Sequence, residues 1–233
     1  MNILVTGASR GIGAAAFALL QSTGHQVVGH STRGGGELIA ADFTDPAGPR
    51  VLWEAAVARL GRIDVLVNNA GIYDGVSDSA SDEEWHAVWG RTLTVNLQAA
   101  ADLSRLAIAH FRANGGGRIV NVSSRAGHRG DSPEHWHYAA SKAGLLGITR
   151  TIARGYAKEN ILAFAVCPGF TMTGMVEEFM ATRGLSEPVI AEIPLGRVAA
   201  AEEVAEAIRW LAIDAPAAST GTVVDVNGAS YVR

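Results

Sequence analysis

Residues 2–13 read NILVTGASRGIG, and this stretch decides the fold class. The run Ile3–Val5 is apolar and predicts a buried strand. Gly7, Gly11 and Gly13 follow it with the spacing GxxxGxG, and a helical pattern begins at Gly11. Glycine lets a chain turn tightly beside a pyrophosphate, and a helix N-terminus presents unpaired N–H groups to it. The stretch predicts a dinucleotide-binding turn, although a glycine-rich turn without a ligand has the same local pattern.

The rest of the chain continues the alternation of strand and helix. The predicted strands are 3–5, 27–28, 38–41, 63–67, 118–122, 161–166 and 222–226. The predicted helices are 11–20, 49–60, one or two within 83–113, 138–158 and 202–212. Continuous apolar strands are typical of parallel sheets. The sequence therefore predicts an α/β protein with a single doubly wound Rossmann-type domain over residues 1–233, in which about seven parallel strands are flanked by helices. Residues 174–193 lack a clear pattern, and we expect them to form a substrate loop.

Composition restricts the class of protein. Of the 233 residues, 48% are hydrophobic and 18% are charged, which is typical of a globular chain. A net charge of −4 without a basic block argues against nucleic acid, and no apolar run is long enough for a membrane span. No signal-peptide pattern precedes Asn2, so we expect a cytoplasmic location. The single Cys167 excludes an internal disulfide, and we expect it to be a buried, inert thiol.

Tyr138 and Lys142 are the first candidates for chemistry. They lie four residues apart in a predicted helix and therefore share a face. A tyrosine pKa is normally near 10, and a nearby cation lowers it, as a general acid/base working near neutral pH requires. Because helix spacing alone also produces YxxxK pairs, this interpretation depends on residues elsewhere.

Further polar clusters support the interpretation of Tyr138 and Lys142 as a catalytic pair. Asn68–Gly71, Ser123–Ser124 and Pro168–Thr173 each follow a predicted strand, and Asn96 follows a helical segment. Open α/β sheets bind ligands at the carboxyl ends of their strands. Ordinary turn chemistry explains any one cluster, but it does not explain all four at one edge.

The combination of TGxxxGxG, NNAG, serine, YxxxK and PGxxxT resembles the single-domain branch of the short-chain dehydrogenase/reductase family, with 3-oxoacyl-carrier-protein reductases among its members. The resemblance implies an NAD(P)-dependent oxidoreductase that transfers a hydride between the nicotinamide and a carbonyl or secondary alcohol. It implies that Tyr138 gives or takes the proton and that Ser124 binds the substrate oxygen. Lys142 would lower the pKa of Tyr138 and hold the nicotinamide ribose, and Asn96 would complete a proton relay through water.

The resemblance also implies the residues that hold the cofactor. Asp42 would meet the adenine, Asn69–Gly71 the adenosine ribose, and Thr173 the carboxamide. The expected cofactor-binding residues are Gly7, Ser9, Arg10, Gly11, Ile12, Gly13, Ser31, Arg33, Asp42, Phe43, Asn69, Ala70, Gly71, Tyr138, Lys142, Pro168, Gly169, Thr171 and Thr173. No metal site is expected, because His135 and His137 lack a cysteine or acidic partner at ligand spacing.

The end of the second predicted strand indicates which nicotinamide cofactor is used. In NAD-binding proteins an acid there accepts from the ribose hydroxyls and would repel a 2′-phosphate. Here Ser31 stands in that place, Arg33 follows two residues later, and Arg10 lies in the glycine-rich turn. Guanidinium groups pair well with phosphate. We expect NADP(H) to be preferred, with NAD(H) as the alternative.

The chain departs from the family pattern in three segments. Only ten residues separate Ser31 from Asp42, where the family has a helix, and Gly34–Gly36 predict a turn instead. The segment Trp85–Asn96 is longer by about one helical turn, and its two tryptophans predict a packed apolar face. The loop 125–137 is also slightly long, and in the family it borders the substrate.

Expected partners are a small carbonyl or alcohol substrate, a carrier-linked acyl chain among the candidates, and further copies of the chain. Leu97–Phe111 and Ala143–Ile152 carry small and apolar residues suited to helix packing, so we expect a homotetramer or homodimer. Three alternatives stay open: a non-catalytic NAD(P)-binding redox sensor, an epimerase or dehydratase, and a halohydrin dehalogenase-like lyase. The intact Tyr138 and Lys142 argue against the first and third, and the chain length argues against the second.

Overall fold

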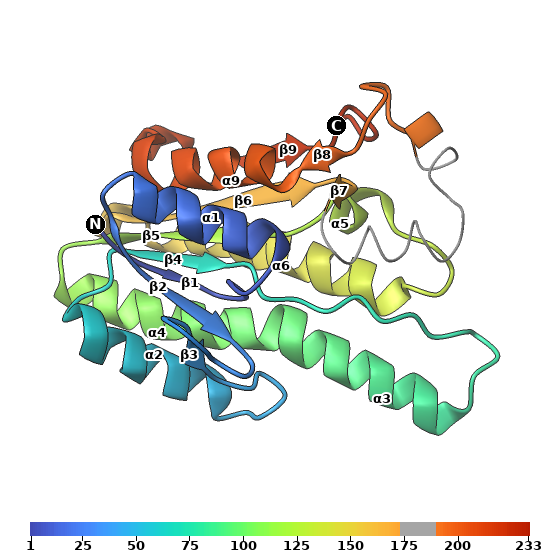
Figure 1. Cartoon of the computed structure of the whole chain (residues 1–233), viewed down its shortest axis with the longest axis horizontal. Helices are drawn as coiled ribbons and strands as arrows, with labels where there is room; N and C mark the ends of the chain where they lie inside the picture. The colour runs from blue at the N-terminus through green and yellow to red at the C-terminus, as the bar shows by residue number, and fades with distance from the viewer. Residues whose placement is uncertain (173–189) are drawn as a thin grey trace.

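A sheet of seven parallel strands forms the centre of the part of the chain that this computed structural model describes, residues 1–172 and 190–233. The strand order is β3-β2-β1-β4-β5-β6-β9 (Figure 1). The strands are β1 (Asn2–Val5), β2 (Gln26–Ser31), β3 (Ile39–Ala40), β4 (Val65–Asn68), β5 (Gly117–Val122), β6 (Ile161–Pro168) and β9 (Val223–Val226). The predicted seven-stranded, doubly wound α/β architecture is confirmed.

Helices cover both faces of the sheet (Figure 1). On one face lie α1 (Gly11–Ser22), α9 (Ala201–Arg209) and the π-helical turn η3 (Trp210–Asp214). On the other lie α2 (Gly48–Leu60), α4 (Ala99–Ala113) and α6 (Trp136–Tyr156). In β1 the side chain of Leu4 packs on the face covered by α2, α4 and α6. The side chains of Ile3 and Val5 pack on the face covered by α1 and α9. This burial on both faces is the reason that the strands read as continuous apolar runs.

The predicted helical region 83–113 consists of α3 (Asp82–Leu93), a π-helical turn η1 (Thr94–Gln98) and α4. Ser81 starts α3, since its hydroxyl accepts from the Glu84 N–H at 3.2 Å. α3 extends beyond the sheet in Figure 1. The expected packed face is confirmed: the Trp85 ring lies 5.7 Å from that of Trp89 and 5.4 Å from that of Trp136 in α6.

Several elements are too short for sequence periodicity to predict them. β7 (Thr171–Met172) and β8 (Ala199–Ala200) form a separate parallel pair, and α5 (Ala126–Arg129) follows β5. The 3₁₀ turns are η2 (Ala157–Glu159) and η4 (Ala217–Ser219). The predicted turn is confirmed at Gly34–Gly36, whose φ angles are 67°, 109° and 58°. No helix among the described residues is long and apolar enough to cross a membrane.

A buried polar network fixes the carboxyl end of the sheet. The Asn68 amide donates to the Asn121 side-chain oxygen at 2.9 Å and to the Ser104 hydroxyl at 3.2 Å. The Asn121 amide donates in turn to the Thr149 hydroxyl at 2.9 Å. These bonds join β4, β5, α4 and α6 directly below the segments that carry the candidate site.

Candidate active site

The glycine-rich turn packs against the end of β4 so closely that side chains are excluded. Gly7 has a φ of 66°, and a Cβ there would lie 2.8 Å from the Ala70 Cα. A Cβ on Gly13 would overlap the Gly7 carbonyl oxygen. The Thr6 hydroxyl accepts from the N–H groups of Asn69 at 2.9 Å and Ala70 at 3.0 Å. The turn and the NNAG segment therefore form one backbone surface.

His30 supports this turn, and sequence analysis did not identify it. Its Nδ1 accepts from the Gly7 N–H at 3.2 Å, and its Nε2 donates to the Ala41 carbonyl at 2.9 Å. The ring stacks on Phe43 with centroids 4.3 Å apart. Burial lowers the pKa of His30, which favours the neutral ring that these bonds require. A histidine inside an apolar strand carries no motif that would reveal this role.

A cavity of about 490 Å³ opens over the turn. Sequence-predicted cofactor residues that line it are Gly7, Ser9, Arg10, Gly11, Ile12, Gly13, Ser31, Asp42, Phe43, Asn69, Ala70 and Gly71. Lining residues that were not predicted are His30, Thr32, Thr44, Ile72, Asp74, Arg91 and Val95. Of these, the Arg91 guanidinium pairs with the Asp74 carboxylate at 2.6 Å.

The N-terminus of α1 faces this cavity with its donors available. No side chain in the described part of the chain caps the helix, and its first turn contains no acidic residue. Arg10 at the N-cap position is exposed and lines the cavity. An uncapped helix N-terminus beside a guanidinium is a donor set that fits phosphate groups. The close glycine contacts and this donor set together fit a bound dinucleotide.

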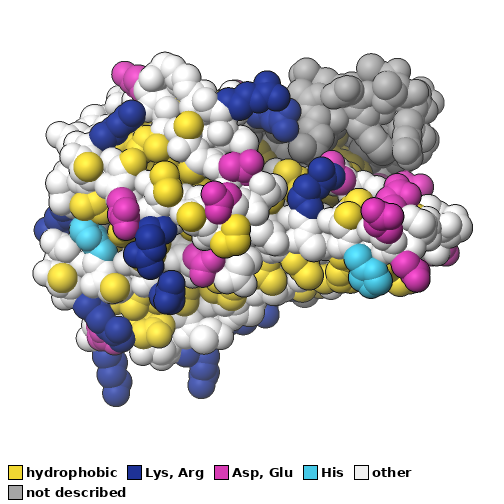
Figure 2. Space-filling view, turned by 90° about the horizontal axis from the view of Figure 1, so that it is seen from below, with side chains coloured by type: hydrophobic (Ala, Val, Ile, Leu, Met, Phe, Trp, Pro, Cys, Tyr) yellow, Lys and Arg dark blue, Asp and Glu magenta, His cyan; other side chains and the backbone are white. Residues whose placement is uncertain are grey.

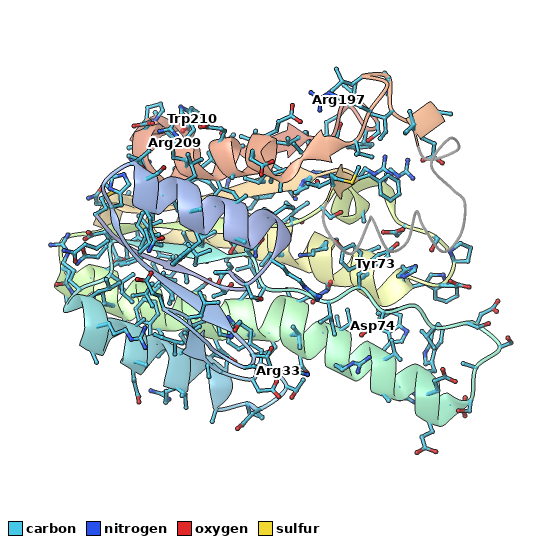
Figure 3. The ribbon with its side chains drawn as sticks, in the orientation of Figure 1. Arg33, Tyr73, Asp74, Arg197, Arg209 and Trp210 are labelled. Atoms are coloured by element: carbon cyan, nitrogen blue, oxygen red, sulfur yellow. The ribbon has the colours of Figure 1, made fainter. Side chains whose placement is uncertain are left out.

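The structure gives weaker support to three other predicted adenosine contacts, which are Arg33, Ser31 and Asp42. Arg33 is exposed on the turn after β2 and does not line the cavity (Figure 3). The Ser31 hydroxyl donates to the Gly34 carbonyl at 3.2 Å, so its proton is used within the turn. The Asp42 carboxylate accepts from the N–H and hydroxyl of Thr44, and these bonds lower the pKa of Asp42.

None of the four candidate catalytic residues lines the cavity, but two of them lie beside Gly71, which does. Tyr138 and Lys142 lie near the start of α6, Ser124 follows β5, and Asn96 lies in η1. The Lys142 ammonium is 5.6 Å from the centroid of the Tyr138 ring. A Cβ on Gly71, which lines the cavity, would lie 3.3 Å from the Asn96 Oδ1 and 3.5 Å from the Lys142 Nζ. Asn96 and Lys142 thus lie beside the cavity, and Tyr138 lies next to Lys142.

Burial dominates the pKa values of Tyr138 and Lys142. Burial raises the pKa of Tyr138 to about 12, although its interaction with the Ser124 hydroxyl acts to lower it. Burial lowers the pKa of Lys142 to about 8. The pKa of Tyr138 therefore lies above its ordinary value in this structure, and the expected lowering effect of Lys142 stays a prediction. Spacing placed the two groups near each other, and desolvation is the largest cause of the shift in each pKa.

Asn96 is held by the segment that follows β4. Its Oδ1 accepts from the Ile72 N–H at 2.8 Å, and its Nδ2 donates to the Ile72 carbonyl at 2.9 Å. The same amide lies 3.4 Å from the Ser141 hydroxyl of α6. The π-helical turn widens the helix at this point and projects a buried amide between β4 and α6.

An aromatic ring that was not predicted, that of Tyr73, contacts Tyr138. The Tyr73 ring stacks on His135 at 3.9 Å and meets Tyr138 edge-on at 4.7 Å. The Tyr73 hydroxyl donates to the Asp131 carboxylate at 3.2 Å, and burial together with Asp131 raises the pKa of Tyr73. Figure 3 shows Tyr73 and Asp74 on the segment after β4. His135 is buried, as is His137, which donates to the Asp74 carbonyl at 2.7 Å. Both side chains belong to the wall of the site.

The remaining predicted contacts lie at the end of β6. Pro168 ends the strand, Gly169 approaches Asn227 so closely that a Cβ would lie 2.8 Å from that residue's Cβ, and Thr171 is buried. None of the three lines the cavity. Thr173 and residues 174–189 of the expected substrate loop lie outside the described residues.

Comparison with known proteins agrees with the fold. The model of a family described as enoyl-(acyl carrier protein) reductase matches residues 7–229. The chain is 36% identical to the 3-oxoacyl-[acyl-carrier-protein] reductase FabG of Escherichia coli (strain K12) over 246 aligned residues, which cover 98% of this chain and 96% of that protein. It is 36% identical to the acetoacetyl-CoA reductase of Rhizobium meliloti (strain 1021), and the alignment covers 98% of this chain and 97% of that protein. The FabG of Thermotoga maritima is also 36% identical, and that alignment covers 97% of this chain and 95% of that protein.

Proposed function

Because this chain belongs to the short-chain dehydrogenase/reductase family, we propose that it reduces the 3-oxo group of acyl thioesters with NADPH. The observation that carries the proposal is the position of Gly71, which lines the cavity and lies beside both Asn96 and Lys142. A cofactor on the glycine-rich turn would then reach the group around Tyr138. The names of the relatives support the substrate class, since they specify a 3-oxoacyl-[acyl-carrier-protein] and acetoacetyl-CoA.

The cofactor's phosphates would lie at the N-terminus of α1, with Arg10 beside them. Asn69–Gly71 would flank the adenosine ribose, and Lys142 would donate to the hydroxyls of the nicotinamide ribose. When bound, the nicotinamide supplies the hydride for the carbonyl carbon. The buried Lys142 is held for this task by its bond to the Val122 carbonyl oxygen at 2.9 Å.

Tyr138 is the proposed proton donor. With a pKa of about 12, its hydroxyl keeps its proton at neutral pH and can give it to the substrate oxygen as the carbonyl is reduced. Ser124 would donate a hydrogen bond to the same oxygen and stabilise the charge that develops there. Lys142, with a pKa of about 8, is still largely an ammonium at neutral pH, and its charge would stabilise the phenolate left behind. Asn96 would hold the water through which Tyr138 regains its proton.

The test is to follow NADPH absorbance with three substrates: acetoacetyl-CoA, a carrier-linked 3-oxoacyl chain and simple ketones. We expect a higher kcat/KM for the thioesters than for the ketones, and product alcohol in equal amount to the NADPH consumed. Cofactor binding is measured separately by calorimetry. If NADPH binds and no carbonyl compound is reduced, the chain is a binding module and the proposal is wrong.

A further inference from the structure

We propose that His128, Cys167 and Asp225 form a site for a thiophilic divalent cation such as zinc, separate from the cofactor cavity. The three residues come from α5, β6 and β9, which lie side by side near the C-terminus (Figure 1). The Cys167 Sγ is 3.5 Å from the His128 Nε2, which is 3.9 Å from the Asp225 Oδ1. All three atoms lie within 4.8 Å of one another.

This spacing is close to that of a tetrahedral site. Zinc bonds of about 2.3 Å to sulfur and about 2.0–2.2 Å to nitrogen and oxygen place ligand atoms roughly 3.4–3.6 Å apart. The sulfur–nitrogen distance already has this value, and the carboxylate has to move by on the order of 1 Å. A thiolate with an imidazole favours zinc and similar cations over magnesium or calcium. Three protein ligands leave one position open for water.

The surroundings of the cluster support the assignment. The Asp225 Oδ1 is buried and lacks a hydrogen-bond partner among the described residues, so a cation would satisfy it. The other carboxylate oxygen accepts from the Arg233 Nε at 3.0 Å. The Tyr231 ring stacks on His128 at 5.4 Å and holds the imidazole plane. Such outer contacts orient metal ligands.

The sequence could not reveal this site, because its residues are spread over 98 positions of the chain and lack any short motif. The expectation of no metal rested on His135 and His137, which are not in the cluster. A bound cation would join α5, which lies in the chain between Ser124 and the start of α6, to the C-terminal strand β9. It would therefore act as a brace on one side of the active site.

The test uses Co²⁺ as a spectroscopic probe for the purified full chain after treatment with a chelator. We expect one equivalent of Co²⁺ to produce a thiolate-to-cobalt charge-transfer band and tetrahedral d–d bands, and Zn²⁺ to displace them. Cys167 is the only cysteine in the chain, so the charge-transfer band reports on it alone. Absence of these bands at stoichiometric Co²⁺ overturns the proposal.

Variants separate the site from unspecific binding. Cys167→Ser should abolish the charge-transfer band, and His128→Asn and Asp225→Asn should each weaken Co²⁺ binding at least tenfold. Arg233→Ala should tighten binding, because it removes a competing cation from Asp225. His86→Asn, which alters an exposed histidine on α3, is the matched control and should change nothing. Equal Co²⁺ affinity in wild type and all three ligand variants, each verified as folded by circular dichroism, would also overturn the proposal.

Discussion

The Lys142 ammonium donates to the Val122 carbonyl oxygen at 2.9 Å, so the last residue of β5 holds the candidate catalytic lysine of α6. This bond uses one of the three ammonium donors and leaves two for other partners. The side chain is only 4% exposed, and a buried ammonium is destabilised relative to its neutral form.

The burial of Lys142 predicts a pH dependence of stability. Its pKa falls from 10.5 to about 8 on folding. Between these values the unfolded chain binds more protons than the folded chain, so the contribution of Lys142 to the free energy of unfolding rises with pH. Urea denaturation at several pH values should show wild type gaining stability relative to Lys142→Met from about pH 8 to 10. A difference that is flat or falls with pH would contradict the lowered pKa.

Tyr138→Phe should lower kcat by well over tenfold, a loss above about 1.4 kcal/mol, because the proposed proton donor is removed. The phenyl ring should keep its edge-on contact with Tyr73, so cofactor affinity should change little. Steady-state kinetics and calorimetric binding of NADPH test the two parts. Tyr73→Phe is the matched control: it loses the hydrogen bonds of the hydroxyl to Asp131 and Ser132 and should retain most of the activity. Retention of a tenth or more of kcat in Tyr138→Phe would rule out its role.

Cofactor preference should depend on Arg10 more than on Arg33. Arg10 lines the cavity and Arg33 does not, although both were expected to meet the 2′-phosphate. We expect wild type to prefer NADPH, Arg10→Ala to lose about tenfold of that preference, and Arg33→Ala to lose less. The measurement is the ratio of kcat/KM for NADPH and NADH. A wild-type preference for NADH, or an unchanged ratio in both variants, would contradict the assignment.

The chain should associate through α4 and α6. Gly147 is exposed on α6, and a Cβ there would meet nothing within 4 Å, so the subunit itself does not require a glycine. Helix interiors disfavour glycine by roughly 0.5–1 kcal/mol relative to alanine, and close approach of a partner helix would account for it. Figure 2 also shows hydrophobic surface along the length of the molecule. Light scattering should give a dimer or tetramer at micromolar concentration, and Gly147→Glu should dissociate it. A monomeric wild type would contradict this prediction.

The sequence predicted the sheet well and the fine structure of the site poorly, for physical reasons. Apolar runs and the glycine spacing follow from burial and close backbone contact, which are local properties, so β1, α1 and the cavity floor were predictable. His30 contacts Gly7, which lies 23 positions away in the chain, and Tyr73 contacts His135, which lies 62 positions away. No local sequence pattern encodes contacts of this kind. Helix spacing predicted that Tyr138 and Lys142 lie close together, but it carries no information on the desolvation that raises the pKa of Tyr138.

The short strand β3 has a consequence for association during folding. It ends the sheet with only Ile39 and Ala40, directly after the turn that contains Gly34–Gly36. The outer edge of a sheet presents unpaired N–H and C=O groups on which strands of other molecules can assemble into fibrils. A two-residue edge is too short a template for such growth, and the flexible backbone beside it disfavours extension. Replacement of this turn by β-branched residues would lengthen the edge and should make the newly synthesised chain more prone to precipitate.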